Sequence, residues 1–242
     1  MVHTIDLYWS MWSPFCYLAM DRLLARDMTV NVAVNVKHVW PGAMRRKGYF
    51  KSLNPNYPSY HGRDTQRLAD YLGLPYARPK PDPLAFDKQT MKPLPLADQP
   101  HIGWLTRVAQ LAVKAGAGMA FLDPVPRLIW GGTVENWHDG EHLLHAVTGT
   151  GLDFKDLRAQ ADAETERLDA IMDANNDTLS AAGHWGVPCM VFEDEPFFGQ
   201  DRMDLLNWRL DQAQKCKPRM PAFRMGAYRR RSSRRPCTAP IP

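Results

Sequence analysis

Residues 3–39 read HTIDLYWSMWSPFCYLAMDRLLARDMTVNVAVNVKHV, and this stretch decides the fold. Apolar residues alternate at Ile5, Leu7 and Trp9, which is the period of a half-buried strand. A turn-like SPFC follows, then a helical pattern of apolar residues three and four apart, and then a second alternating run, TVNVAVNV. A strand, a helix and a strand at this length predict a βαβ unit, with parallel strands and a right-handed crossover.

The last part of the body returns to strand patterns. Residues 187–199, VPCMVFEDEPFFG, predict two short strands joined by the acidic turn EDEP. Residues 200–214, QDRMDLLNWRLDQAQ, predict a closing amphipathic helix. Between the two halves the sequence has four helical patterns, over residues 63–73, 104–119, 136–147 and 155–182.

The order β-α-β, helices, β-β-α predicts an α/β protein with a thioredoxin-like fold and an inserted all-helical domain. The expected bounds are 1–40 for the first half of the thioredoxin-like domain, 41–182 for the mostly helical insertion, 183–215 for the second half and 216–242 for a tail.

The charge of the chain is concentrated in that tail. Residues 217–242 contain Lys217, seven arginines and no acid, a charge of +8, and subtracting it from the net +4 leaves −4 for residues 1–216. The tail is also rich in proline and serine and shows no helical or strand period, so we expect it to be disordered. An arm that binds nucleic acid or another acidic partner is the less favoured interpretation, and no nucleic-acid partner is expected.

No run of 18 apolar residues occurs, so we expect no membrane span. The N-terminal sequence MVHTIDLYWSMWS lacks the pattern of a secretory signal, which favours a cytoplasmic protein. The cysteines show no CxxC or zinc-like spacing and should be reduced there. They are Cys16, Cys189, Cys216 and Cys237.

The turn between the first strand and the first helix carries the predicted chemistry. Pro14 fits the first helical position, and the N–H groups of such a helix start favour an anion such as a thiolate. Ser13 has two interpretations: it caps the helix, or its hydroxyl also donates a hydrogen bond to a glutathione thiolate. Cys16 has no cysteine partner at position 13, so the dithiol for disulfide exchange is missing and a buried apolar role is favoured.

A second motif follows at Val187-Pro188, where a proline begins a predicted strand. This is expected if Pro188 is cis and faces the first turn, with Val187 offering its backbone to a peptide-like ligand as an added strand. Gln200-Asp201 begins the closing helix. Asp201 is either an N-terminal capping acid or a ligand for the charged end of the γ-glutamyl group of glutathione.

The SP turn, GVP and FFGQDR, in this order, resemble the 2-hydroxychromene-2-carboxylate isomerases. These belong with the kappa-class glutathione transferases in the DsbA-like branch of the thioredoxin superfamily. Residues 60–67, YHGRDTQR, resemble the family's Y-x-x-x-D-x-x-R. The resemblance implies a thiol-activating serine, a cis-proline backbone contact, a γ-glutamyl site and a glutathione-contacting asparagine. These residues are Ser13, then Val187 and Pro188, then Gln200 and Asp201, and Asn54.

Two positions depart from the family pattern. The stretch FKSLNPNYP differs from the usual Asn-x-Pro-Pro context, which weakens the assignment of Asn54. Cys16 stands where a second serine is common, which leaves a redox-sensitive variant open.

The resemblance implies an enzyme with glutathione as cofactor and a small aromatic carboxylate as substrate, acting as a homodimer. In the isomerase the thiolate adds to a conjugated ring-opened substrate, allows rotation about a former double bond and leaves unchanged. A kappa-like glutathione transferase and a non-catalytic thioredoxin-fold binding protein are the alternatives; a disulfide oxidoreductase is disfavoured by Ser13. Trp9 and Trp12 either line the substrate pocket or belong to the core.

Two other site types are disfavoured. His138, His142 and His145 have helical metal-ligand spacing around Glu141, but no acidic or cysteine cluster accompanies them, so no metal is expected. A serine-hydrolase site is not expected because the sequence has no GxSxG motif.

Overall fold

The protein has a four-stranded mixed sheet, described here from a computed structural model that covers residues 2–25, 32–46, 48–139 and 141–215. The strands are β1 (His3–Trp9), β2 (Val32–His38), β3 (Cys189–Phe192) and β4 (Glu195–Phe198). Their order in the sheet is β2-β1-β3-β4, with β1 and β2 parallel and the other two pairs antiparallel. The parallel pairing of β1 with β2 and the hairpin of β3 and β4 were both predicted.

The helices of the two halves are close to the prediction. They are α1 (Pro14–Ala25) and, after the 3₁₀ turn η3 (Gln200–Arg202), α10 (Met203–Lys215). Val30, which belongs to the predicted second strand, lies outside the described residues, and so do the cysteines and arginines of the predicted tail.

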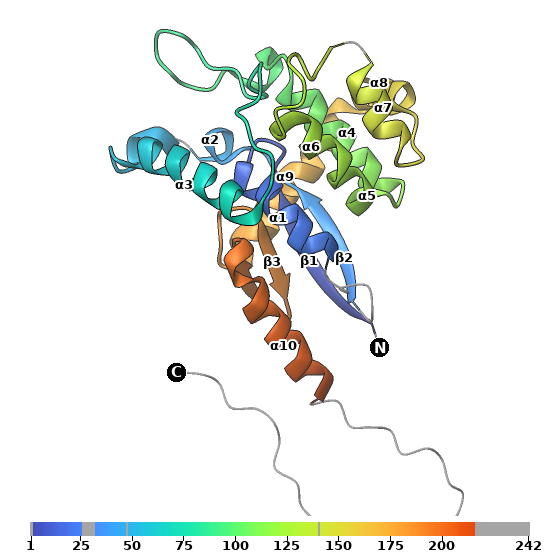
Figure 1. Ribbon diagram of the computed structural model, residues 1–242. Helices are drawn as coiled ribbons and strands as arrows, with labels where there is room; N and C mark the ends of the chain where they lie inside the picture. The colour runs from blue at the N-terminus through green and yellow to red at the C-terminus, as the bar shows by residue number, and fades with distance from the viewer. Residues whose placement is uncertain (1, 26–31, 47, 140, 216–242) are drawn as a thin grey trace, which may run out of the picture.

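The segment between β2 and β3 is helical, and its helices α4 to α8 gather on one side of the molecule, away from α3 (Figure 1). The α-helices are α2 (Gly42–Arg45), α3 (Tyr57–Leu72), α4 (Ile102–Lys114), α5 (Gly118–Leu122), α6 (Pro124–Trp130), α7 (His142–Thr148), α8 (Phe154–Ala163) and α9 (Thr165–Ala181). Two 3₁₀ turns, η1 (Tyr49–Ser52) and η2 (Leu96–Asp98), lie between them.

The predicted helix boundaries in this segment were partly wrong. The pattern over 155–182 forms two helices that meet at Glu164, and the pattern over 104–119 breaks where Gly116 takes a φ of 79°. The helix predicted from residue 63 begins earlier, at Tyr57, because Pro58 fits a helix start, which needs no backbone N–H from it. Helix α6 was missed because its prolines suggest a loop, although they lie in its first turn.

β1 lies between β2 and β3 in the sheet, with one face buried along its whole length and the other face buried at Tyr8. Ile5, Leu7 and Trp9 are at most 1% exposed on the face that joins the main core. Tyr8 points to the opposite face and donates its hydroxyl to Thr178 of α9 at 3.1 Å. Trp9 is therefore a core residue, one of its two predicted roles. Within the described ranges, no helix has the length and apolar character needed to cross a membrane.

Candidate functional site

Ser13 lies at the start of α1, directly after the loop that leaves β1. Its Oγ accepts the N–H of Cys16 at 3.3 Å, and its carbonyl oxygen accepts the amides of Cys16 and Tyr17 at 3.1 and 3.3 Å. Ser13 is therefore the N-cap of α1. The Cys16 amide occupies an acceptor site of Ser13 Oγ, so the hydroxyl proton of Ser13 is still available, either to the Cys16 sulfur or to a ligand in the cleft.

Cys16 lies behind Ser13 in the core and is 1% exposed. Burial raises the pKa of its thiol to about 12, although the Ser13 side chain and the charge of Arg45 act in the opposite direction. The thiol is therefore neutral at physiological pH, as expected for a buried cysteine that acts as a small apolar residue. Cys189 is buried as well, and the pKa of its thiol is raised to about 12 by the same cause.

The second motif lies opposite the first turn. The Val187–Pro188 peptide bond is cis, as predicted, and the carbonyl oxygen of Pro188 accepts the N–H of Gly199 at 2.9 Å. Neither the N–H nor the carbonyl oxygen of Val187 has a hydrogen-bond partner among the residues that the structure describes. An extended peptide could use both groups as an added strand, which is the role predicted for Val187.

Two hollows bring the predicted site residues together. The main cleft has a volume of about 700 Å³ and is lined by Ser13 and Val187. A second hollow of about 480 Å³ is lined by Pro188, Gln200 and Asp201. Phe15 and Phe198 line both hollows. The two hollows therefore adjoin, and five of the six predicted residues line one or the other.

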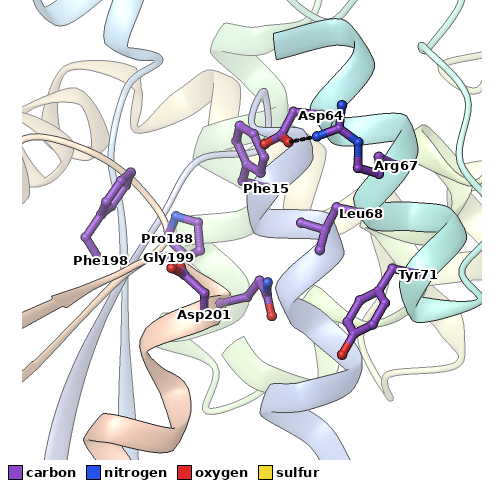
Figure 2. A pocket seen from close by; sticks show the side chains of 10 residues that line it. Phe15, Asp64, Arg67, Leu68, Tyr71, Pro188, Phe198, Gly199 and Asp201 are labelled. Carbon is purple, nitrogen blue, oxygen red and sulfur yellow. Dashed lines mark hydrogen bonds and ion pairs between the residues drawn. The ribbon is translucent and has the colours of Figure 1, made fainter. Parts of the chain in front are cut away.

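The second hollow lies between α3 and the start of α10 (Figure 2). On one side, Asp64 and Arg67 of α3 form an ion pair at 3.2 Å. On the other, Asp201 is exposed and pairs with Arg202 at 2.8 Å. The carbonyl oxygen and Oε1 of Gln200 both accept from Arg22, at 2.8 and 2.9 Å, so the amide nitrogen is the part of this side chain left for a ligand.

Asn54 is the predicted residue that the structure does not bring to either hollow. Its side chain is exposed, and its Oδ1 accepts the N–H of Asn56 at 2.9 Å in the turn before α3. The neighbouring Leu53 lines the main cleft instead. The geometry therefore assigns Asn54 a role in forming this turn.

The walls of the main cleft are aromatic and basic, which the sequence indicated only at Trp12. Its aromatic residues come from the first turn and start of α1, the segment after β2, helix α6, the loop before Val187 and the end of β4. They are Trp12, Phe15, Tyr49, Phe50, Tyr57, His61, Tyr76, Phe86, Trp130, Trp185 and Phe198. Trp12 thus lines the cleft, the pocket-lining role being one of the two predicted for it. Three arginines, Arg45, Arg46 and Arg78, line the same cleft against one acid, Asp82.

Asp82 joins the inserted segment to the first turn. Its Oδ1 accepts the indole N–H of Trp12 at 2.8 Å and the amide of Leu84 at 2.9 Å. Burial raises the pKa of Asp82, opposed by these two hydrogen bonds and by the charge of Arg78. Burial likewise lowers the pKa of His61, and Arg78 adds to that shift. The charge of Arg78 therefore reaches both sides of the cleft.

The histidines with helical metal-ligand spacing do not share one helix. His142 and His145 lie on α7, whereas His138 precedes it, and His145 pairs with Glu141 at 3.6 Å. Across the described part of the chain, no three histidine, cysteine or acidic side chains are arranged to hold a metal ion.

Comparison with known proteins shows the family. A model of the DSBA-like thioredoxin domain matches residues 4–211, so the chain belongs to the DSBA-like thioredoxin family. This also confirms the predicted fold. No curated protein sequence matches the chain.

Solved structures with similar folds include both isomerases and oxidoreductases. A 2-hydroxychromene-2-carboxylate isomerase is 20% identical with a TM-score of 0.62, over 88% of this chain and 96% of that one. A probable DsbA oxidoreductase from Streptomyces coelicolor is 19% identical with a TM-score of 0.59, over 93% and 94%. The cytosolic disulfide reductase DsbM from Pseudomonas aeruginosa, also solved with GSH, is 18% identical with a TM-score of 0.52, over 86% and 99%. At these identities the likeness establishes the fold.

Proposed function

We propose that this member of the DSBA-like thioredoxin family is a glutathione-dependent isomerase acting on a conjugated aromatic carboxylate of the 2-hydroxychromene-2-carboxylate type. The observation that carries the proposal is the meeting of Ser13 and Val187 in one cleft. Ser13 caps a helix and keeps a hydroxyl proton to donate, and Val187 has an unused backbone donor and acceptor. A short peptide with a thiol fits this pair, with its backbone along Val187 and its sulfur beside Ser13.

Ser13 would stabilise the thiolate in two ways. Its hydroxyl donates a hydrogen bond to the sulfur, and the N–H groups of the first turn of α1 add partial positive charge. The buried Cys16 thiol already shows the direction of this effect, because the Ser13 side chain lowers its pKa. A glutathione sulfur on the cleft side of Ser13 avoids the burial that keeps Cys16 neutral, so there the lowering would dominate.

The second hollow suits the γ-glutamyl end of glutathione. The Asp201 carboxylate would bind the α-ammonium group, and the Gln200 amide would bind the α-carboxylate. Gly199 allows Asp201 to lie close to the chain: its φ is 90°, and a Cβ there would lie 2.6 Å from Asp201 Oδ1. Because the hollow adjoins the main cleft at Phe15 and Phe198, one ligand could occupy both.

The main cleft suits an aromatic anion as substrate. Its aromatic walls can stack on a flat ring, and Arg46 and Arg78 can bind a carboxylate. Glutathione held by Ser13 and Val187 would supply a nucleophilic thiolate for reversible addition to the conjugated substrate. The chain's own residues orient the substrate, and Ser13 holds the sulfur as an anion before and after.

A kappa-like transferase would use the same residues but consume glutathione. A disulfide reductase is less well supported, because residue 13 is serine and Cys16 is buried. An enzyme that uses reduced glutathione needs a reducing compartment, so we expect this protein to act in the cytoplasm.

Calorimetry with glutathione and S-methylglutathione tests the proposal. At pH 7 the binding of glutathione should release about one proton per site, because the site stabilises the thiolate, whereas S-methylglutathione should bind without this release. Comparing binding enthalpies in buffers of different ionisation enthalpy counts the protons. A failure to bind either ligand, or binding of glutathione without proton release, would refute thiolate activation. Loss of free glutathione during turnover would indicate the transferase.

Asp201→Asn should weaken glutathione binding by about tenfold, because it removes the charge that would pair with the α-ammonium group. Titration at pH 7 measures this, and a glutathione analogue without the α-amino group should bind both proteins equally. Asp194→Asn is the matched control: Asp194 is an exposed acid in the turn between β3 and β4, outside both hollows. Equal affinity in Asp201→Asn and the parent would show that the γ-glutamyl group lies elsewhere.

A further inference from the structure

Arg45 is a guanidinium in the main cleft without a carboxylate partner among the described residues. It ends α2, and its Nε donates to the Trp40 carbonyl oxygen at 2.6 Å. Its Nη2 donates to the Trp185 carbonyl oxygen at 3.1 Å. Trp40 follows β2, and Trp185 lies two residues before Val187. Arg45 therefore joins the start of the inserted segment to the loop that carries the predicted peptide contact.

The two carbonyl oxygens accept hydrogen bonds from Arg45, but they carry no negative charge to neutralise its guanidinium. Other arginines of the body are neutralised differently. Arg107 is paired with Asp169 at 2.7 Å, and Arg22 with Asp204 at 2.7 Å. A half-buried cation without an acid costs desolvation energy that an anionic ligand would recover. The burial that lowers the pKa of Arg45 to about 10 still leaves it cationic at neutral pH.

Arg45 and Ser13 line the same cleft, and both act on the Cys16 thiol behind it. The Cys16 thiol interacts with the Ser13 side chain, and the charge of Arg45 lowers the pKa of the same thiol. The field of Arg45 therefore reaches a sulfur next to the Ser13 hydroxyl. Arg46 follows Arg45 in sequence and lines the same cleft, but its guanidinium lies over the Tyr49 ring, 5.7 Å from the centroid.

We infer that Arg45 supplies the counter-charge for the ligand thiolate held by Ser13, an inference that rests on the proposed function. Ser13 provides the hydrogen bond that places the sulfur, and Arg45 provides the net positive charge that a hydroxyl cannot. Its two carbonyl contacts hold the guanidinium in place, so the charge is present before the ligand arrives. The arginines of the cleft thus have different ligands. Arg45 lies near the thiolate, and Arg46 and Arg78 can bind the substrate carboxylate.

The test is the pKa of the bound glutathione thiol, followed by the ultraviolet absorbance of the thiolate, with the S-methylglutathione complex as the blank. Arg45→Gln should raise this pKa by about one unit or more, since an opposite charge nearby lowers an acid's pKa by about 1–3 units. Arg45→Lys keeps the charge and should retain most of the lowering. Arg46→Gln, the matched removal of a neighbouring charge, should change the pKa by less than about a third of a unit.

Binding of S-methylglutathione separates charge from structure. It has no thiolate, so Arg45→Gln should bind it within about threefold of the parent, which also shows that the variant is folded. An unchanged thiol pKa in Arg45→Gln would overturn the inference while leaving the proposed function standing. An equal rise in Arg46→Gln, or Arg45→Lys behaving like Arg45→Gln, would overturn it as well. If the parent binds neither ligand, the proposed function and this inference fall together.

Discussion

Ser13→Ala should reduce turnover of a conjugated aromatic carboxylate by about 100-fold or more, with little change in the KM for glutathione. The reason is that the Ser13 hydroxyl is expected to contact the sulfur, whereas Val187 and the second hollow are expected to bind the rest of the tripeptide. Removal of one preorganised donor to a developing or resident anion costs about 10²–10³ in kcat at comparable sites. Steady-state kinetics at saturating glutathione, repeated across pH, measures the effect. The residual activity should rise toward high pH, where the thiol ionises without help.

The control for Ser13→Ala must separate chemistry from helix capping, because Ser13 also accepts the Cys16 amide. Loss of the cap should cost about 1 kcal/mol of unfolding free energy, too little to unfold a domain of ordinary stability. Ser13→Thr keeps both the cap and the hydroxyl and should retain at least about a tenth of the activity. Full activity in Ser13→Ala would show that Ser13 is only the N-cap.

The fold could be predicted because its halves have strong local periods. The alternation Ile5, Leu7, Trp9 matches a strand buried in the centre of the sheet, and the proline at Val187-Pro188 marks the cis bond that the structure contains. The helical segment was predicted less well. Alternating or amphipathic patterns identify long elements, but a break such as the one at Glu164 depends on tertiary packing, which leaves no local period.

The residues of the candidate site also fall into two groups: those that a local motif predicts and those that depend on tertiary contacts. Ser13, Val187 and Asp201 belong to motifs with a local physical reason: a helix start, a cis proline and a second helix start. Arg45 and Asp82 could not be predicted, because their roles depend on where a segment of irregular structure returns to the sheet. Arg45 contacts a loop 140 residues away along the chain, and Asp82 contacts Trp12 across 70 residues. A single sequence holds no signal for such pairs.

Acid should destabilise the protein through His38, the last residue of β2. His38 is fully buried beside Trp9 in the parallel register, and neither ring nitrogen has a partner among the described residues. Burial lowers the pKa of His38 from 6.5 to about 3. Above pH 6.5 the ring is neutral in both states and contributes nothing to the pH dependence. Below pH 6.5 the unfolded chain gains a proton that the folded protein cannot accept until about pH 3, so stability falls with decreasing pH over this window.

The contribution of His38 to the pH dependence of stability is large enough to measure by comparing the parent with a variant. One proton taken up on unfolding changes the free energy of unfolding by about 1.4 kcal/mol per pH unit, so His38 should account for a loss of about 2 kcal/mol between pH 6.5 and 5. His38→Phe should remove that loss, seen by denaturant unfolding at pH 7.5 and 5. At pH 7.5 it should be at least as stable as the parent, because it deletes two unpartnered buried nitrogens.

Other titrating groups also change the stability of both proteins with pH. The effect of His38 is therefore the difference between the parent and His38→Phe in the loss of unfolding free energy on acidification. His142→Gln, at an exposed histidine of α7, should show the parent's pH dependence. If His38→Phe loses as much stability on acidification as the parent, the His38 ring accepts a proton in the folded state. A polar partner, protein or water, would then have to lie beside it. A flatter pH profile for His38→Phe would instead show that the His38 ring stays neutral in the folded protein at pH 5.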